Sequence, residues 1–162
     1  MAKILLFGSS TIFGVPNEVL SWLEQYVAQG HEFIVGDCKG SEAAFHKALS
    51  SVGADKVTIY SMGAPRNNNF RFPSKQFDTH YNEDTKQATL TCEGQQVYTI
   101  AGVEKEMDIP YTREWYEFKD KQMIQDCHMA IGLYDGKSKG TLHMIQLLGI
   151  YNKPCYTFTI EV

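Results

Sequence analysis

This sequence has few cysteines and no large excess of positive or negative charge. Four cysteines occur among 162 residues, at positions 38, 92, 127 and 155, and no two of them form a Cys-x-x-Cys pair. That spacing excludes a typical zinc site and a dense disulfide framework, so we expect reduced thiols and a cytoplasmic location. The formal net charge of −4 gives no basic excess and argues against nucleic acid as a partner.

Long apolar runs are also absent. No segment approaches the ~20 apolar residues of a membrane span, and the first apolar run ends after five letters (KILLF) at Gly-Ser-Ser, which excludes a signal peptide. The five histidines show no metal-binding spacing, so no metal or cofactor is expected, and His46 and His143 are predicted to lie at the surface. The length suits one domain, residues 1–162.

What the chain does have is an alternation of apolar runs and amphipathic segments. The runs predict strands at 3–7, 31–35, 56–61, 129–134 and 155–160, with helices between them that begin near residues 16, 41, 113 and 141. Pro16 is expected as a first helical residue and Ser41 as an N-cap. Continuous apolar strands that alternate with helices are typical of a mainly parallel α/β sheet with helices on both faces.

Residues 64–112 interrupt this alternation. The segment APRNNNFRFPSKQF reads as a loop and carries Arg66, Arg71 and Lys75 without an acid, while ATLTCEGQQVYTI predicts a hairpin that turns at Glu93-Gly94. We interpret 64–112 as an insertion in the single domain, lying over the carboxyl ends of the strands. Its cations either close over an anionic ligand or remain solvated.

Loops rich in glycine and hydroxyl groups follow the strands at 8–11, 36–42, 62–63 and 135–141. Each alone is as well explained by a tight turn. Ligands of parallel sheets bind beyond the carboxyl ends of the strands, and free N–H groups at helix starts bind anions. Neither a Walker A nor a Gly-x-Gly-x-x-Gly pattern occurs. The predicted ligand-binding residues are Gly8, Ser9, Ser10, Gly36, Lys39, Gly40, Ser41, Gly63, Asp135, Gly136, Ser138, Gly140 and Thr141.

Three stretches, GDCKGSEAAFHKAL, FKDKQMIQDCHMAIGLYDGKSKGTLHMIQLL and NKPCYTF, resemble the SLOG superfamily of Rossmann-like nucleotide-binding domains. Its members include the lonely-guy phosphoribohydrolases and the DNA-processing protein DprA, and nucleoside deoxyribosyltransferases are similar in outline. The resemblance covers the chain outside the insertion. It implies a Rossmann-like three-layer sandwich with about five mainly parallel strands and a hairpin-containing insertion. It also implies a nucleotide or nucleoside monophosphate as ligand, in a homo-oligomer.

The resemblance also implies which residues act. Gly36 and Gly40 match the family's second loop, with Glu42 at the place of its acid, and Lys119-Asp120 replaces a charged pair that usually begins with arginine. Lysine is a poorer bidentate phosphate ligand than arginine.

The phosphoribohydrolase motif continues with Gly140 and Thr141, but Met144 stands where that motif carries the glutamate that assists cleavage of the N-glycosidic bond. Another carboxylate would have to replace it. The candidate catalytic residues are Glu42, Asp37, Lys119 and Asp120.

Two functions remain open at this point: an N-glycosidic hydrolase or transferase, and a non-catalytic protein that senses or sequesters a nucleotide signal. A DNA-binding module is disfavoured by the acidic balance and the small size. The aromatic residues Trp115, Tyr116 and Phe118 either form a base-stacking face or belong to the core, and the core is the favoured interpretation.

Overall fold

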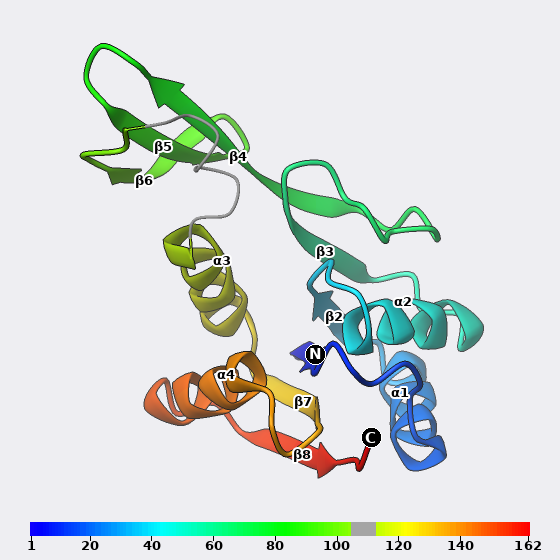
Figure 1. Cartoon of the computed structure of the whole chain (residues 1–162). Helices are drawn as coiled ribbons and strands as arrows, with labels where there is room; N and C mark the ends of the chain where they lie inside the picture. The colour runs from blue at the N-terminus through cyan, green and yellow to red at the C-terminus, as the bar shows by residue number, and fades with distance from the viewer. Residues whose placement is uncertain (105–112) are drawn as a thin grey trace.

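The computed structural model describes residues 1–104 and 113–162, and Figure 1 shows their arrangement. In chain order the elements are β1 (Lys3–Gly8), α1 (Asn17–Ala28), β2 (Glu32–Val35), α2 (Ser41–Ser51), β3 (Val57–Met62), β4 (Ser74–Asn82), β5 (Gln87–Cys92), β6 (Gln95–Ile100), α3 (Arg113–Asp126), β7 (Met129–Tyr134), α4 (Lys139–Ile150) and β8 (Cys155–Thr159). No helix within these residues has the length and apolar character needed to cross a membrane.

The strands form one sheet in the order β6-β5-β4-β3-β2-β1-β7-β8. The pairs from β4 across to β8 are parallel, and only β4–β5 and β5–β6 are antiparallel. The chain passes from β1 outward to β2 and β3, and later returns to the other side of β1 with β7 and β8. The strand order therefore reverses beside β1, which confirms the predicted Rossmann-like α/β class and marks the edge where such sheets bind ligands.

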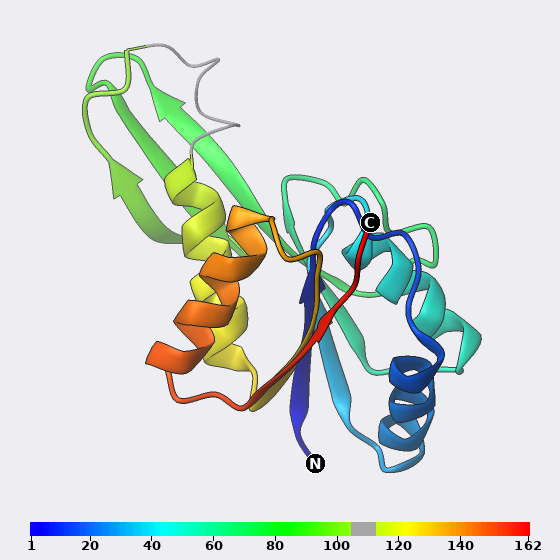
Figure 2. The same cartoon turned by 60° about the horizontal axis from the view of Figure 1, so that its bottom comes forward.

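Helices cover both faces of the sheet, with α1 and α2 on one side and α3 and α4 on the other (Figures 1 and 2). Strand β1 serves both layers by alternation. Ile4 and Leu6 join the apolar cluster under α1 and α2, while Leu5 and Phe7 join the cluster under α3 and α4. Burial on both faces explains why this strand reads as an unbroken apolar run.

Three predicted helix starts are corrected by the structure. Pro16 is the N-cap of α1 and precedes its first helical residue. Gly40, at φ +80°, is the N-cap of α2 in place of Ser41. The Ser41 hydroxyl instead donates a hydrogen bond to the Ser9 carbonyl oxygen at 2.7 Å. Helix α4 begins two residues before the predicted Thr141, at Lys139.

The insertion is only partly what its sequence predicts. The Glu93-Gly94 turn is confirmed, with φ of 53° and 78° at the two residues, as a type I′ turn requires. The loop expected up to residue 77 is wrong in its last part, because β4 begins at Ser74 and pairs in parallel with β3. Strand β4 then runs past the end of β3 and pairs with β5, so the insertion adds three strands to the edge of the sheet.

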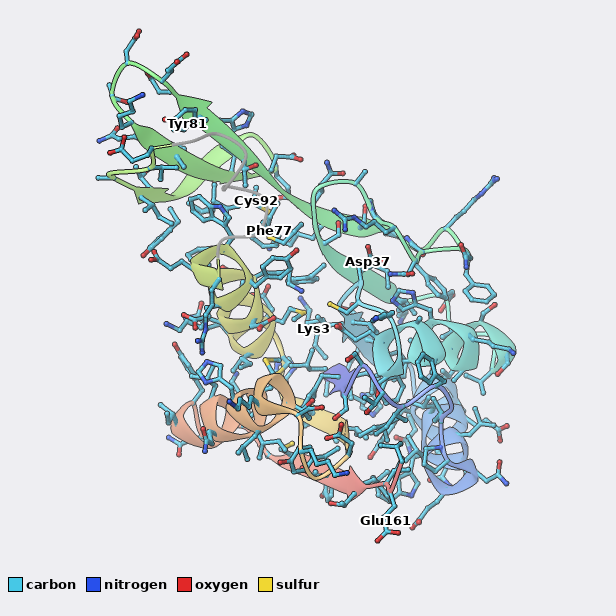
Figure 3. All side chains as sticks on the ribbon, viewed as in Figure 1. Lys3, Asp37, Phe77, Tyr81, Cys92 and Glu161 are labelled. Atoms are coloured by element: carbon cyan, nitrogen blue, oxygen red, sulfur yellow. The ribbon has the colours of Figure 1, made fainter. Side chains whose placement is uncertain are left out.

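Aromatic rings join the insertion to α3. Tyr98 of β6 lies edge-on to Trp115 at 5.9 Å between ring centroids and 5.6 Å from Phe118, and Phe77 of β4 lies 6.4 Å from Phe118. Phe77 faces its strand partner Cys92 across β4 and β5 (Figure 3). Trp115 is fully buried, which settles its role as core. The insertion therefore shares the apolar cluster of α3 and α4.

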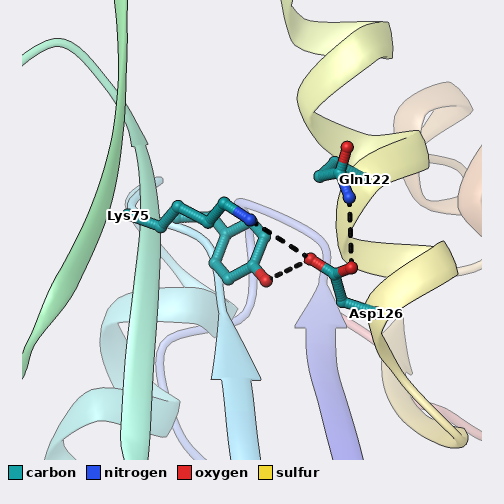
Figure 4. Close-up of polar contacts among 4 residues, drawn as sticks. Lys75, Gln122 and Asp126 are labelled. Atoms are coloured by element: carbon teal, nitrogen blue, oxygen red, sulfur yellow. Dashed lines mark hydrogen bonds and ion pairs between the residues drawn. The ribbon is translucent and has the colours of Figure 1, made fainter. Parts of the chain in front are cut away.

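Polar contacts hold the other end of α3 to the sheet (Figure 4). The Asp126 carboxylate accepts hydrogen bonds from the Tyr60 hydroxyl at 2.5 Å and from Gln122 Nε2 at 3.1 Å. The ammonium of Lys75 lies 3.7 Å from the same carboxylate. Burial and this bond raise the pKa of Tyr60, so its phenol stays protonated. Lys75 thus tethers β4 to α3 and does not close over a ligand.

Candidate functional site

Three adjoining cavities lie along the carboxyl ends of the strands, beginning where the strand order reverses. The inner cavity, of about 250 Å³, is lined by Phe7, Gly8, Ser10, Cys38, Glu42, Tyr116, Lys119, Asp120, Met123, Ser138, Gly140, Thr141 and Met144. The central cavity, of about 500 Å³, is lined by Ser10, Asp37, Cys38, Lys39, Ser61, Met62, Arg66, Asn67, Tyr116 and Lys119. The outer cavity, of about 370 Å³, is lined by Met62, Gly63, Arg66, Phe77, Asp78, Thr79, His80 and Tyr116.

A buried lysine and two carboxylates define the electrostatics of the inner cavity. The Lys119 residue is only 3% exposed, and its Nζ lies 3.7 Å from Asp120 Oδ1. Burial alone would lower the pKa of Lys119, but the charges of Glu42 and Asp120 outweigh it and raise that pKa. Burial, together with the charge of Glu42, raises the pKa of Asp120 to about 6 although Lys119 opposes the shift. Asp120 therefore exchanges its proton near neutral pH, as a general acid must.

The absence of a side chain at Gly36 leaves room for the Glu42 carboxylate. A Cβ atom added at Gly36 would overlap that carboxylate and displace the flexible end of the Glu42 side chain. Gly40 is needed for a similar reason, because its Cβ would overlap the Ser10 backbone. These two glycines thus allow neighbouring chain segments to pack closely.

Cys38 borders both the inner and central cavities without being a nucleophile. The nearby Glu42 charge, with burial as a second cause, raises the pKa of this thiol to about 12. The thiolate is the reactive form of cysteine, and at neutral pH it is essentially unpopulated here. Cys38 therefore contributes polarizable surface to the cleft.

The first turn of α4 presents unpaired donors to the inner cavity. The backbone N–H groups of Lys139, Gly140 and Thr141 precede the first intrahelical bond, which Leu142 donates to the Ser138 carbonyl oxygen. Within residues 1–104 and 113–162 these three N–H groups have no backbone acceptor. Together with the positive end of the helix dipole, these N–H groups favour negative charge at the start of α4, and Gly140 and Thr141 line the same cavity as Lys119.

Asp135 organises the loop before α4. Its carboxylate accepts hydrogen bonds from the Ser138 and Thr11 hydroxyls, at 2.6 and 2.7 Å, and from the backbone N–H groups of Lys137 and Ser138. These bonds hold the pKa of Asp135 well below its usual range. Both oxygens accept bonds from within the chain, so Asp135, predicted from the sequence to bind a ligand, has a structural role in this loop.

Asp37 and His46 likewise serve the backbone. The Asp37 carboxylate accepts the N–H groups of Arg66 and Asn67, at 2.5 and 3.0 Å, and so holds the loop after β3 (Figure 3). This bonding replaces the catalytic role expected for Asp37. The surface prediction for His46 is wrong: it is fully buried, with Nε2 2.8 Å from the Gly36 carbonyl oxygen.

The structure divides the residues predicted from sequence into two groups. Those that line one of the cavities are Gly8, Ser10, Asp37, Lys39, Glu42, Gly63, Lys119, Asp120, Ser138, Gly140 and Thr141. Those that line none of the three cavities are Ser9, Gly36, Gly40, Ser41, Asp135 and Gly136. The buried Ser9 hydroxyl, for example, bonds to Thr141 Oγ1 at 3.0 Å and accepts the Asp135 N–H.

Tyr116 lines the cleft, although the sequence favours a core position for it. It lines all three cavities, whereas its neighbour Trp115 is in the core. The core prediction treats Trp115, Tyr116 and Phe118 alike, but consecutive helical residues point about 100° apart. That rotation was the available signal that one ring of the pair would face the cleft.

The raised pKa of Asp120 makes stability depend on pH. Its pKa is 3.8 ordinarily and about 6 in the fold, so the folded state binds more protons between these values and loses stability as the pH rises through them. Asp120→Asn removes the ionisable group, so its free energy of unfolding should exceed that of the wild type by up to about 3 kcal/mol at pH 8 and by little at pH 4. Urea unfolding at both pH values measures this. Exposed Glu114 provides the control Glu114→Gln, and an equal gain at both pH values would contradict the assignment.

Comparison with known proteins supports the fold. No protein-family model and no curated protein matches the chain. Among solved structures, it is similar to DNA processing protein A from Helicobacter pylori, described for its single-stranded DNA binding mode, with a TM-score of 0.61 and 12% sequence identity. The match covers 99% of this chain and 66% of that chain, so this chain spans slightly less than two thirds of its neighbour's length.

This similarity corrects one expectation. Net charge was taken to argue against nucleic acid as a partner, yet a protein of this fold is described as binding single-stranded DNA. Total charge is a poor guide here because charge is unevenly distributed: Lys39, Arg66 and Lys119 all line the central cavity of a chain whose net charge is −4. The structural neighbour and the motifs of the sequence thus agree on a Rossmann-like fold of the kind found in DNA processing protein A.

Proposed function

We propose that the chain binds a nucleotide unit, free or within single-stranded nucleic acid, in the joined inner and central cavities. One observation carries the proposal: the open N–H groups at the start of α4 face the same cavity as the buried ammonium of Lys119. Two sources of positive potential at the point where strand order reverses suit a phosphate group. The same proposal includes membership of the SLOG superfamily, which the sequence motifs support. It also includes a cytoplasmic location, which the spacing of the cysteines supports.

The phosphate is assigned to α4 alone, although the sequence suggested a site shared with α2. At the start of α2 the Ser41 N–H already donates to the Ser9 carbonyl oxygen at 3.2 Å, and Ser41 is fully buried. The base is assigned to the half-buried ring of Tyr116, which borders both cavities and offers a stacking surface.

The carboxylates in the inner cavity suit cleavage or transfer at the N-glycosidic bond. In this proposal Asp120 protonates the departing base as the bond between C1′ and the base nitrogen breaks, and the bonding electrons leave with the base. Glu42 stabilises the positive charge that develops on the sugar and accepts a proton from the attacking water. Met144 lines the same cavity with an apolar side chain, so the glutamate usual in phosphoribohydrolases has no counterpart at this position.

Blocking the anion site should abolish binding without unfolding the protein. Gly140 lines the inner cavity and has open space where a Cβ would point, so Gly140→Val should fold, and its larger side chain beside the open N–H groups should weaken binding of nucleoside monophosphates by at least tenfold. Gly149 has equally open surroundings in α4 but lines none of the three cavities. Isothermal titration should therefore show wild-type affinity for Gly149→Val. Equal affinity of the two folded variants would overturn the site.

A nucleotide-sensing role without catalysis is the competing function, and Met144 at the usual glutamate position favours it. A panel of nucleoside monophosphates, followed by assay of free base and phosphosugar, separates the two. Binding with base release supports the enzyme. Tight binding without release of any base identifies a sensor or sequestering protein.

A further inference from the structure

The cavities differ in charge in a way that a single nucleotide does not explain. The inner cavity pairs Lys119 with two carboxylates, Glu42 and Asp120. The central cavity also contains Lys39 and Arg66, and its one carboxylate, Asp37, already accepts two backbone N–H groups. Negative charge on a ligand is therefore more favourable in the central cavity than in the inner one. The phosphate at α4 leaves this second cationic region unused.

The cavities also differ in size and origin. The inner cavity, at about 250 Å³, lies below the ~300 Å³ at which ligand pockets usually begin. The outer cavity adds about 370 Å³ and adjoins the central one at Met62, Arg66 and Tyr116, which line both. One of its walls is β4, which contributes Asp78, Thr79 and His80. The outer cavity is thus a product of the insertion, with room for a further planar group.

We infer that the ligand contains at least two linked nucleotide units, and that the insertion builds the subsite for the second. The inference rests on the proposed function. The first unit has its phosphate at α4 in the inner cavity and extends into the adjoining part of the central cavity. The linking phosphate lies in the central cavity beside Lys39 and Arg66, and the second unit enters the outer cavity between Tyr116 and β4.

The test compares ligands that differ by one unit. Isothermal titration of the full chain with nucleoside 5′-monophosphates, nucleoside 3′,5′-bisphosphates and 5′-phosphorylated dinucleotides, each with the four common bases, should give the tightest binding for a dinucleotide. A charge-assisted hydrogen bond to the linking phosphate corresponds to a gain of about 10- to 150-fold. The bisphosphate should recover the part of the gain that the phosphate alone supplies. The salt dependence of binding should steepen by about 0.7 in log–log slope for the added phosphate.

Two arginines of the same loop provide the matched variants. Arg66→Asn should remove most of the gain and the added salt dependence. Arg71→Asn should keep both, because Arg71 lines none of the three cavities, and its φ of 54° is one that asparagine tolerates. Equal affinity for mononucleotide and dinucleotide, with Gly140→Val still weakening both, would overturn the second subsite and leave the proposed function intact. Failure of every nucleotide to bind would overturn both.

Discussion

Glu42→Gln is expected to lower the rate of base release by about 10²- to 10⁴-fold, the usual contribution of a proton-transferring group. Glutamine has the same shape and fits the space that Gly36 leaves, but it carries no negative charge. Nucleotide affinity should remain within a few-fold of wild type, or improve slightly, because the carboxylate opposes the bound phosphate. Steady-state assays of base release, with titration of the same variant, measure the two quantities separately.

The control is Glu24→Gln, which removes an exposed carboxylate from α1 and should leave the rate unchanged. A Glu42→Gln enzyme with the wild-type rate would refute the role of Glu42. If the wild-type protein binds a nucleoside monophosphate tightly and releases no base, the nucleotide-sensing function replaces the enzymatic one.

Lys119→Met is expected to have the largest effect on binding and stability together. Loss of the ammonium removes a charged donor to phosphate, so nucleotide affinity should fall by about 10- to 150-fold. It also leaves Glu42 and Asp120 as two buried carboxylates without a cation, and breaking such a pair costs about 3–5 kcal/mol. Because Asp120 is partly exposed, the lower end of that range is expected.

The loss of stability should depend on pH in a defined direction. Lys119 lowers the pKa of Asp120, so in Lys119→Met that pKa should rise above its wild-type value of about 6. The variant is then destabilised most at pH 8 and least at pH 5, where Asp120 carries a proton. Lys121→Met, at an exposed position of α3, is the control. A destabilisation independent of pH would contradict the coupling of Lys119 to Asp120.

The sequence predicts the parallel part of the sheet well because burial on both faces leaves a strong signal. The runs at 3–7 and 129–134 became β1 and β7 within a residue of their expected ends. Strand β4 has no such signal: its sequence SKQFDTHYN is polar and only Phe77 is buried. Its pairing with β3 is long-range, and the preceding Asn- and Pro-rich segment indicates a loop, so β4 was missed.

The site shows where sequence reasoning fails at the level of single side chains. Polar residues at strand ends either face a ligand or bond to their own backbone, and composition does not distinguish the two. Asp37, Asp135 and Ser41 all form bonds within the chain. Glu42 and Asp120 are acidic residues like Asp37 and Asp135, yet they line the inner cavity. Only the direction of each side chain, which packing around Gly36 and Lys119 determines, separates these groups.

The attachment of the insertion outside β3 separates two parts of the candidate site. Strands β3, β2, β1, β7 and β8 remain adjacent, and the helices that carry Glu42 and Thr141 follow β2 and β7 of this parallel group. Residues exchanged along β4 alter the outer cavity but leave the first turn of α4 unchanged. Changes in the insertion are therefore expected to alter which ligands fit the outer cavity, and to leave the proposed phosphate contacts at α4 as they are.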